Sequence, residues 1–296
     1  MIRNCVVVGL AMGLPWAVHA EESASPLTWL KNHGVQIRKT FNGTSQDALA
    51  PAAFSYDKSD DDSFTRADLG FKYAFWPFDG DAAAPVTASL AGEYHRSTKQ
   101  FEEVDKQTGA LSIDTLLGPE TWDFVGNLSY DLTHDSVKSQ TTRVIALRTG
   151  FAFNESPLPH SDIRLGETLF LRYLPTAGIE HYDNLAVTQQ QGDQEVTLAE
   201  AVSVSTAFAR MNVELRPFYG ALGSRVVLTG TYTYRQRLNG STAVKDDTYL
   251  LESSLDWYLD DGLQVAIGVS YQRGYDPGRN FLKQEITSIG LKLKVG

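Results

Sequence analysis

Cysteine is almost absent from this chain: Cys5 is the only one among 296 residues. A scaffold held together by disulfide bridges is therefore excluded. After the N-terminal segment 1–20, no apolar run reaches the length of about eighteen residues that a membrane-spanning helix needs. Basic residues are also in short supply, with 26 lysines and arginines against 36 acidic residues. A broad nucleic-acid-binding surface, which requires an excess of positive charge, is not expected.

Recognisable catalytic and cofactor motifs are missing as well. The sequence contains no G-x-S-x-G nucleophile elbow, no pair of histidines at metal-ligand spacing and no phosphate-binding loop. We therefore predict no catalytic residue, no metal site and no cofactor, and we do not expect an enzyme.

Residues 1–20 have the composition of a secretory signal peptide. Arg3 supplies the positive charge, residues 5–14 form a short apolar segment, and Val18-His19-Ala20 provides a small-residue cleavage site. Cys5 precedes the apolar segment, so it is not placed to become a lipid-modified N-terminus. Export without disulfides is typical of a bacterial envelope protein, and we expect the chain in the outer membrane of a Gram-negative cell.

Residues 21–50 are predicted to form an N-terminal periplasmic segment with a short helix near Ser25–Gly34. Ser25 can cap this helix, Pro26 suits its first turn and Gly34 follows its end. The remaining residues, 51–296, are predicted to form one domain.

The last segment of this domain, from Tyr249 to Val295, alternates between apolar and polar side chains. Side chains in a β-strand point alternately to opposite faces, so each stretch has one apolar and one polar face. A soluble β-sandwich would show the same alternation, and that alternative stays open. The export signal and the strand length of about ten residues favour a transmembrane β-barrel.

The whole domain can be divided into twelve antiparallel strands. They are predicted at Ala52–Asp57, Thr65–Trp76, Val86–His95, Thr121–Thr133, Thr142–Phe153, Ile163–Leu174, Ala177–Asn184, Val202–Leu215, Arg225–Leu238, Thr248–Leu259, Leu263–Arg273 and Glu285–Val295. The seventh has the weakest pattern; without it, Pro175–Gly178 would be a bend inside one long strand. An even count is preferred because it places both chain ends on the periplasmic side.

Connection lengths support the same count. With the first strand running outward, the long connections Ser97–Glu120, Asn154–Asp162 and Leu185–Ala201 fall on the outer side. Shorter turns, such as His134–Thr141 and Pro175–Thr176, fall on the inner side. Long outer loops and short periplasmic turns are the asymmetry expected of outer-membrane barrels.

Together, the leader, the alternating strands and the amphipathic final strand resemble bacterial outer-membrane β-barrel proteins as a superfamily. The resemblance covers about Ala50 to Val295 and is architectural; it indicates no specific family. It implies outer-membrane lipids, lipopolysaccharide and the barrel-assembly machinery as partners. Members commonly end in an aromatic residue, whereas this chain ends in Val295-Gly296. The resemblance leaves the oligomeric state undefined.

If the apolar faces meet lipid, the opposite faces line the lumen. We predict a porin-like channel for passive passage or export of small solutes, with anions favoured because arginine and lysine rings attract them. The predicted pore-lining residues are Arg148, Arg164, Arg172, Arg210, Arg235, Arg237, Glu93, Asp123, Glu214 and Glu252.

Two other functions stay open. A non-conducting barrel, filled by ion pairs across its lumen, could serve as a surface receptor or as an accessory of a secretion or glycan-export system. An outer-membrane lipid hydrolase would need a histidine to activate a serine. His95, His134, His160 and His181 are the candidate bases, and Ser129, Ser203 and Ser205 the candidate nucleophiles.

Overall fold

A computed structural model describes most of the region from Val35 to Leu293. The described ranges are 35–38, 52–58, 63–76, 86–98, 104–118, 122–137, 140–153, 162–166, 168–184, 187–191, 194–199, 202–222, 225–242, 244–259, 264–277 and 281–293. The predicted signal peptide and the predicted helix near Ser25–Gly34 lie outside these residues. Within them, no helix is both long and apolar enough to cross a membrane.

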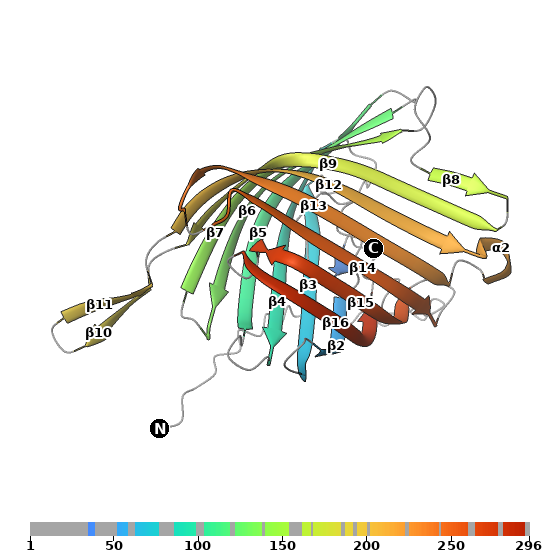
Figure 1. Cartoon of the computed structure of the whole chain (residues 1–296). Helices are drawn as coiled ribbons and strands as arrows, with labels where there is room; N and C mark the ends of the chain where they lie inside the picture. The colour runs from blue at the N-terminus through green and yellow to red at the C-terminus, as the bar shows by residue number, and fades with distance from the viewer. Residues whose placement is uncertain are drawn as a thin grey trace, which may run out of the picture.

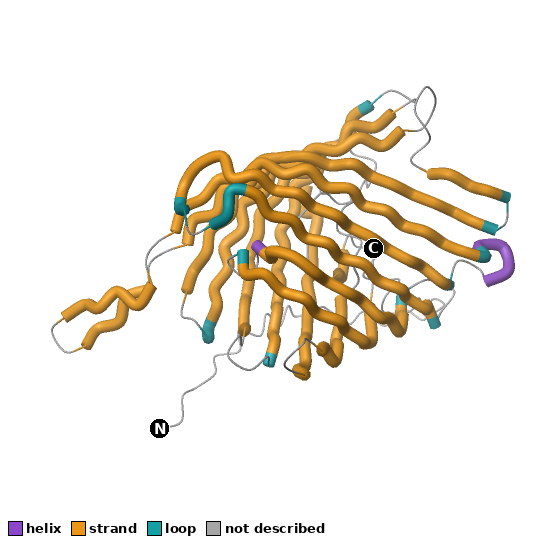
Figure 2. The backbone as a smooth tube through the Cα atoms, viewed as in Figure 1, coloured by secondary structure: helices purple, strands orange, loops and turns teal. Residues whose placement is uncertain are grey.

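Nearly all of the described chain is β-strand (Figure 2). The strands are β1 (Val35–Arg38), β2 (Ala52–Lys58), β3 (Ser63–Trp76), β4 (Val86–Ser97), β5 (Val104–Leu117), β6 (Trp122–Asp135), β7 (Gln140–Phe153), β8 (Asp162–Leu165), β9 (Leu169–Asn184), β10 (Val187–Gln191), β11 (Gln194–Ala199), β12 (Val202–Pro217), β13 (Val226–Gly240), β14 (Asp247–Tyr258), β15 (Val265–Asp276) and β16 (Leu282–Leu293). One short helix, α2 (Tyr219–Leu222), lies between β12 and β13.

Twelve strands, β2–β7, β9 and β12–β16, close into an antiparallel barrel (Figure 1). Closure is made by β16 and β2, which pair from Thr287–Lys58 to Leu293–Ala52. The predicted fold class, a closed twelve-stranded antiparallel barrel, is confirmed. Every backbone edge in this ring has a neighbour, which is the condition for strands to cross a lipid bilayer.

The four other strands attach to this ring or stand apart from it. β1 pairs with β3 from Val35–Tyr73 to Arg38–Gly70, next to the stretch of β3 that pairs with β2. β8 pairs with the first residues of β9. β10 and β11 form a separate hairpin in the 185–201 connection, which projects away from the barrel in Figure 1.

The predicted strand list reached twelve through two errors that cancel. It missed β5, which lies inside the predicted loop Ser97–Glu120, because the lumen-facing side of β5 carries Ala110 and Ser112 beside few charges and no aromatics. It also divided β9 at Pro175, where the alternative of a strand that continues past Pro175 is correct. Proline is tolerated there because pairing of β9 with β7 stops at Thr176 and pairing with β8 stops at Arg172, so no ladder bond is lost on that side. The predicted start of that strand at Ile163 is wrong, because Ile163 belongs to β8, a separate strand that pairs antiparallel with β9.

These errors reversed two of the predicted connections. Ala52 and Leu293, the first and last described residues of the ring, lie at one end of the barrel and are called its termini here. The loop after β6, near His134–Thr141, lies at the opposite end, and β7 and the strand that follows it are joined at the end that carries these termini. The 185–201 connection is at the opposite end, as predicted. Apart from it, most connections at that end are shorter than those at the end that carries Ala52 and Leu293, so loop length does not by itself orient this barrel.

Each barrel strand turns an apolar side chain outward and a polar one inward. The exposed apolar side chains, one from each strand, are Phe54, Leu69, Leu90, Leu111, Leu128, Leu147, Ile179, Met211, Tyr232, Leu255, Val269 and Ile289. The buried inward ones are Asp57, Lys72, Glu93, Ser112, Asp131, Arg148, Glu180, Glu214, Arg235, Asp256, Gln272 and Lys292. This inversion of the usual soluble pattern is that of a membrane barrel.

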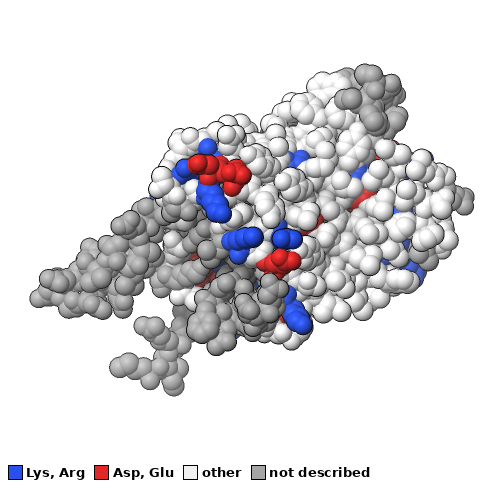
Figure 3. Space-filling view, viewed as in Figure 1, with Lys and Arg blue, Asp and Glu red and all other residues white. Residues whose placement is uncertain are grey.

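Aromatic and charged side chains mark the borders of the apolar wall. Trp122 and Phe124 contact Phe151 at the end near the termini, with ring centroids 5.9 and 5.5 Å apart. Tyr249 packs between Tyr232 and Tyr275 near the opposite end. In Figure 3 the wall over β12–β15 is almost free of charge, and charged atoms gather toward the end that carries β10 and β11. Aromatic rings and charges at both borders suit the two bilayer interfaces.

Candidate functional site

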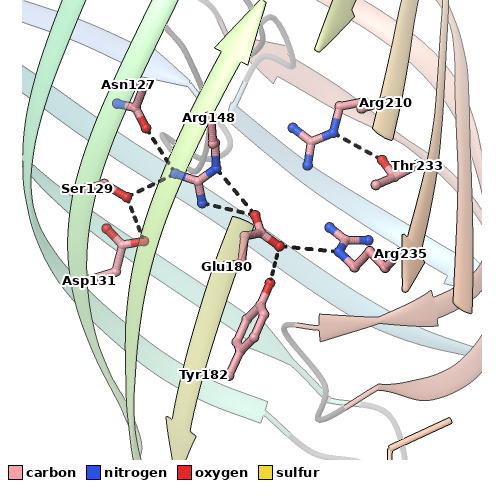
Figure 4. Close-up of polar contacts among 9 residues, drawn as sticks. All are labelled: Asn127, Ser129, Asp131, Arg148, Glu180, Tyr182, Arg210, Thr233 and Arg235. Carbon is pink, nitrogen blue, oxygen red and sulfur yellow. Dashed lines mark hydrogen bonds and ion pairs between the residues drawn. The ribbon is translucent and has the colours of Figure 1, made fainter. Parts of the chain in front are cut away.

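The most densely connected polar group in the lumen is centred on Glu180 of β9. Its Oε1 accepts hydrogen bonds from Nε and Nη2 of Arg148, each at 3.3 Å, and its Oε2 is 3.3 Å from Nε of Arg235. The hydroxyl of Tyr182 donates to the same Oε2 at 2.6 Å. We call Glu180, Arg148, Arg235, Tyr182 and Arg210 the lumen cluster (Figure 4).

Period-two geometry explains why these residues converge. Arg148 on β7 pairs with Gly178 on β9, two residues before Glu180, so both side chains point inward. Arg235 belongs to β13 and reaches Glu180 across β12. One carboxylate therefore joins three strands that are far apart in sequence.

Arg148 also binds the wall on its other side. Its Nη1 donates to Oδ1 of Asn127 at 3.0 Å and to Oγ of Ser129 at 2.9 Å, both on β6. Ser129 in turn lies 3.5 Å from Oδ2 of Asp131. Charged groups withdrawn from water are tolerated only when paired and hydrogen-bonded, and Arg148 meets both conditions.

Arg210 completes the lumen cluster from β12. Its Nε donates to Oγ1 of Thr233 at 3.0 Å, and its guanidinium lies 5.2 Å from the centroid of the Phe208 ring. In Figure 4, Arg210 and Arg235 lie on one side of Glu180 and Arg148 on the other. The cluster therefore presents three guanidinium groups around one carboxylate.

Two more ion pairs also pass over an intervening strand. Nζ of Lys72 on β3 binds Oδ2 of Asp114 on β5 at 2.5 Å, and Nζ of Lys292 on β16 binds Oδ1 of Asp256 on β14 at 2.5 Å. In the second case the residue beneath the pair is Gly268 of β15, which pairs with Asp256 on one side. An added Cβ at Gly268 would lie 2.1 Å from Oδ1 of Asp256 and 3.0 Å from Cε of Lys292.

The Gly268→Ala variant is therefore expected to separate Lys292 from Asp256 and to lower the free energy of unfolding by about 1–3 kcal/mol. Urea titration of the refolded barrel measures this. The matched control is Gly230→Ala on β13, where an added Cβ meets no atom within 4 Å. Alanine at this outward-facing strand position should be neutral or slightly stabilising. Equal losses in the two variants would contradict the proposed role of Gly268.

The predicted pore-lining residues fall into separate groups. Arg148, Arg210 and Arg235 meet in the lumen cluster, while Arg164, Arg172 and Glu214 lie together at the end near the termini. At the opposite end Arg237 binds Asp246, and Glu93 hydrogen-bonds Nε2 of His95 at 3.1 Å. The inward-facing residues Asp123 and Glu252 belong to none of these three groups.

Three functional candidates were missing from the predicted set of pore-lining residues. Asp114 was hidden because β5 was taken for a loop, and Arg216 because the strand at Val202–Leu215 was ended two residues early. Glu180 faces inward as its alternation predicts, but only the barrel register shows that two arginines share it.

Within the described ranges, His95, His134 and His181 do not form a Ser-His-Asp triad. Nδ1 of His181 is 2.9 Å from Oγ of Ser205, on the outer face between β9 and β12. Among the described residues no carboxylate contacts His181, so the pair lacks the group that would orient the imidazole. His95 is held between Asp68 and Glu93, and His134 contacts Thr141; His160 lies outside the described residues. The described part of the chain contains no group of three or more residues placed to hold a metal ion.

No protein-family model matches the sequence, and no curated protein matches it. Solved structures with a similar arrangement include the NanC porin, at 11% identity and a TM-score of 0.41, with 82% of this chain and 98% of that chain covered. The KdgM porin in complex with disordered oligogalacturonate has 8% identity and a TM-score of 0.39, with 83% and 99% covered. The translocator domain of the autotransporter NalP from Neisseria meningitidis has 12% identity and a TM-score of 0.42, with 88% and 86% covered. Such low similarity transfers no ligand or activity to this chain.

The chain's own geometry is more informative. A closed ring of twelve strands turns an apolar wall outward and a network of ion pairs inward. This combination would be unstable in water, where the exposed apolar wall would aggregate, and it matches the solvent of a lipid bilayer. The chain therefore has the fold and the surface pattern of a transmembrane β-barrel.

Proposed function

We propose that this protein is a narrow outer-membrane channel for the passive passage of small charged solutes. The observation that carries the proposal is the polar, charged inner wall of a closed twelve-stranded ring. A barrel of this size is wider than one that its side chains simply fill. A protein that needed only a filled core would be expected to use apolar side chains, because burying charges is costly.

The narrowest level of the passage is proposed to be the lumen cluster. Arg148, Glu180 and Arg235 face the lumen and are nevertheless almost completely buried, so neighbouring side chains cover them. A constriction of paired charges lowers the cost for an ion of leaving bulk water. It also keeps binding weak, since each wall charge already has a partner.

The cluster also supports a preference for anions. Three guanidinium groups, from Arg148, Arg210 and Arg235, face the carboxylates of Glu180 and Asp131. The positive charge of the lumen cluster is partly offset by nearby carboxylates, since Glu93 acts on Asp131 and Asp276 acts on Arg235. The region is shielded from water, and charge acts more strongly there than at a surface. The resulting selectivity is expected to be weak.

The test is single-channel conductance of the refolded chain in a planar bilayer, with selectivity measured from the reversal potential in a salt gradient. The wild-type protein should show stable conductance steps with anion preference. Arg210→Glu combined with Arg237→Glu should invert that preference, because both side chains face the lumen and are less buried than Arg148. Arg273→Gln, on the outer face, is the control and should leave selectivity unchanged. An unchanged reversal potential in the double variant would contradict the proposal.

The burial of the lumen cluster also favours a second candidate, a non-conducting barrel that anchors a receptor or a secretion accessory. The β10–β11 hairpin at the end opposite the termini would then be the working part. A folded barrel without conductance, whose function is lost when residues 187–199 are deleted, would support this alternative. Under either function we propose outer-membrane lipids, lipopolysaccharide and the barrel-assembly machinery as partners, and export directed by residues 1–20.

A further inference from the structure

The barrel wall extends on one side beyond the closed ring. Pairing between β7 and β9 stops at Gly150–Thr176, whereas β9 and β12 remain paired as far as Leu169–Pro217. β8 takes the place of β7 along this stretch, from Asp162–Arg172 to Leu165–Leu169. The result is a three-stranded extension of β8, β9 and β12, visible beside α2 in Figure 1.

The face of this extension that continues the lumen wall carries three arginines around one phenylalanine. The guanidinium groups of Arg172 and Arg216 each lie 5.5 Å from the centroid of the Phe170 ring, and that of Arg164 lies 5.9 Å from it. A flat aromatic ring attracts cations and supports planar guanidinium groups without accepting hydrogen bonds from their N–H groups.

Two carboxylates share the same face. Arg172 binds Asp162 through two hydrogen bonds, Nε to Oδ1 at 2.7 Å and Nη2 to Oδ2 at 2.8 Å. Nε of Arg216 binds Oε1 of Glu214 at 2.6 Å. Among the described residues of this face, Arg172 and Arg216 each bind a carboxylate, and Arg164 lies against the ring of Phe170.

Asp162 is the counter-ion that an external anion could replace. Its side chain is 46% exposed and that of Arg172 is 43% exposed, so their pairing is largely in water and contributes little to stability. Glu214, in contrast, is buried. β8 lies outside the closed ring, and the hydrogen bond from Arg172, with Arg164 and Arg216 nearby, lowers the pKa of Asp162. The Asp162 carboxylate therefore experiences a positive potential that would act equally on a bound anion.

We infer that this face is a binding site for small oxyanions, which are carboxylates or phosphates. Asp162 binds the guanidinium of Arg172 until such an anion displaces it. The two parallel N–H groups that now hold Asp162 fit any carboxylate or phosphate in the same bidentate geometry. Arg164 and Arg216 flank this position across Phe170. The inference deepens the proposed function and rests on it, because the extension forms the mouth of the same lumen at the end near the termini.

The proposed exchange predicts opposite changes in anion affinity for substitution of Asp162 and for substitution of the arginines. Asp162→Asn removes the internal competitor, so the protein should bind inorganic phosphate and succinate about fivefold more tightly. Arg172→Gln and Arg164→Gln should each weaken binding about tenfold. Isothermal titration of the refolded full-length chain in detergent measures these affinities, and resistance to unfolding on unheated gels shows that each variant is folded. Comparing phosphate with succinate identifies which oxyanion is preferred.

A second exposed arginine–carboxylate pair provides a matched control. Arg273 and Glu285 are 49% and 44% exposed and lie 3.4 Å apart, but on the outer face of β15 and β16. Arg273→Gln and Glu285→Gln should leave both affinities unchanged. Weaker or unchanged binding in Asp162→Asn would overturn the exchange, and equal effects at the control pair would overturn the site. Because binding is measured at equilibrium, a barrel that conducts without binding refutes only this site, and one that binds without conducting refutes only the channel.

Discussion

Replacing Glu180 with glutamine is expected to lower the free energy of unfolding by about 3–5 kcal/mol, since it removes the charge that Arg148 and Arg235 share. Both arginines are almost completely buried, so water cannot take over from the lost carboxylate. The amide keeps the shape of the side chain, and the loss therefore reports charge rather than a cavity. Urea-induced unfolding in phospholipid vesicles, followed by tryptophan fluorescence, measures the change.

Glu285→Gln provides the comparison, because Glu285 also faces an arginine but both partners are about half exposed. Its removal should change the free energy of unfolding by less than about 1 kcal/mol. The double variant Glu180→Gln with Arg235→Gln should recover part of the stability lost in the single variant, since one of the two unpaired charges is gone. Additive losses in the double variant, or equal losses at Glu180 and Glu285, would show that Glu180 is not shared in this way.

The faces of the strands could be predicted from the sequence because they depend on a local rule. Leu255, Val269 and Ile289 turn outward and Arg148 and Arg235 turn inward, as their period-two alternation indicates. Predicting which charged side chains face inward requires only this rule. The predicted strand boundaries were also close to the observed ones wherever apolar side chains filled the outward face.

The rule fails where one face carries no strong signal. β5 has Gly109 in its outward row and Thr108, Ala110 and Ser112 along the middle of its inward row, so its alternation is weak there. Pro175 imitates a turn where β9 continues past the end of β7. Both errors concern pairing, which a single strand does not encode. For the same reason the sequence could not show that Glu180, rather than the arginines alone, joins the lumen cluster: Arg235 reaches it across β12 only in the observed register.

The second large effect on folding stability is expected when a charge is placed in the apolar outer wall. Leu147 lies near the middle of β7, faces outward and is 51% exposed. Arginine at this position would place a charge in the hydrocarbon core of the bilayer, and we expect a loss of about 2–4 kcal/mol in the free energy of folding. Folding into phospholipid vesicles, measured by urea titration, reports this loss.

Leu238→Arg, near the end of β13 and also facing outward, should cost no more than about 1 kcal/mol, because the cost of a charge falls toward the interface. Arg143 of the wild-type chain is exposed near the first residues of β7, so a charge is already present at this border of the apolar wall. If Leu147→Arg and Leu238→Arg were equally stable, the outer wall would not be meeting a bilayer, and the soluble alternative left open by the alternation alone would have to be reconsidered.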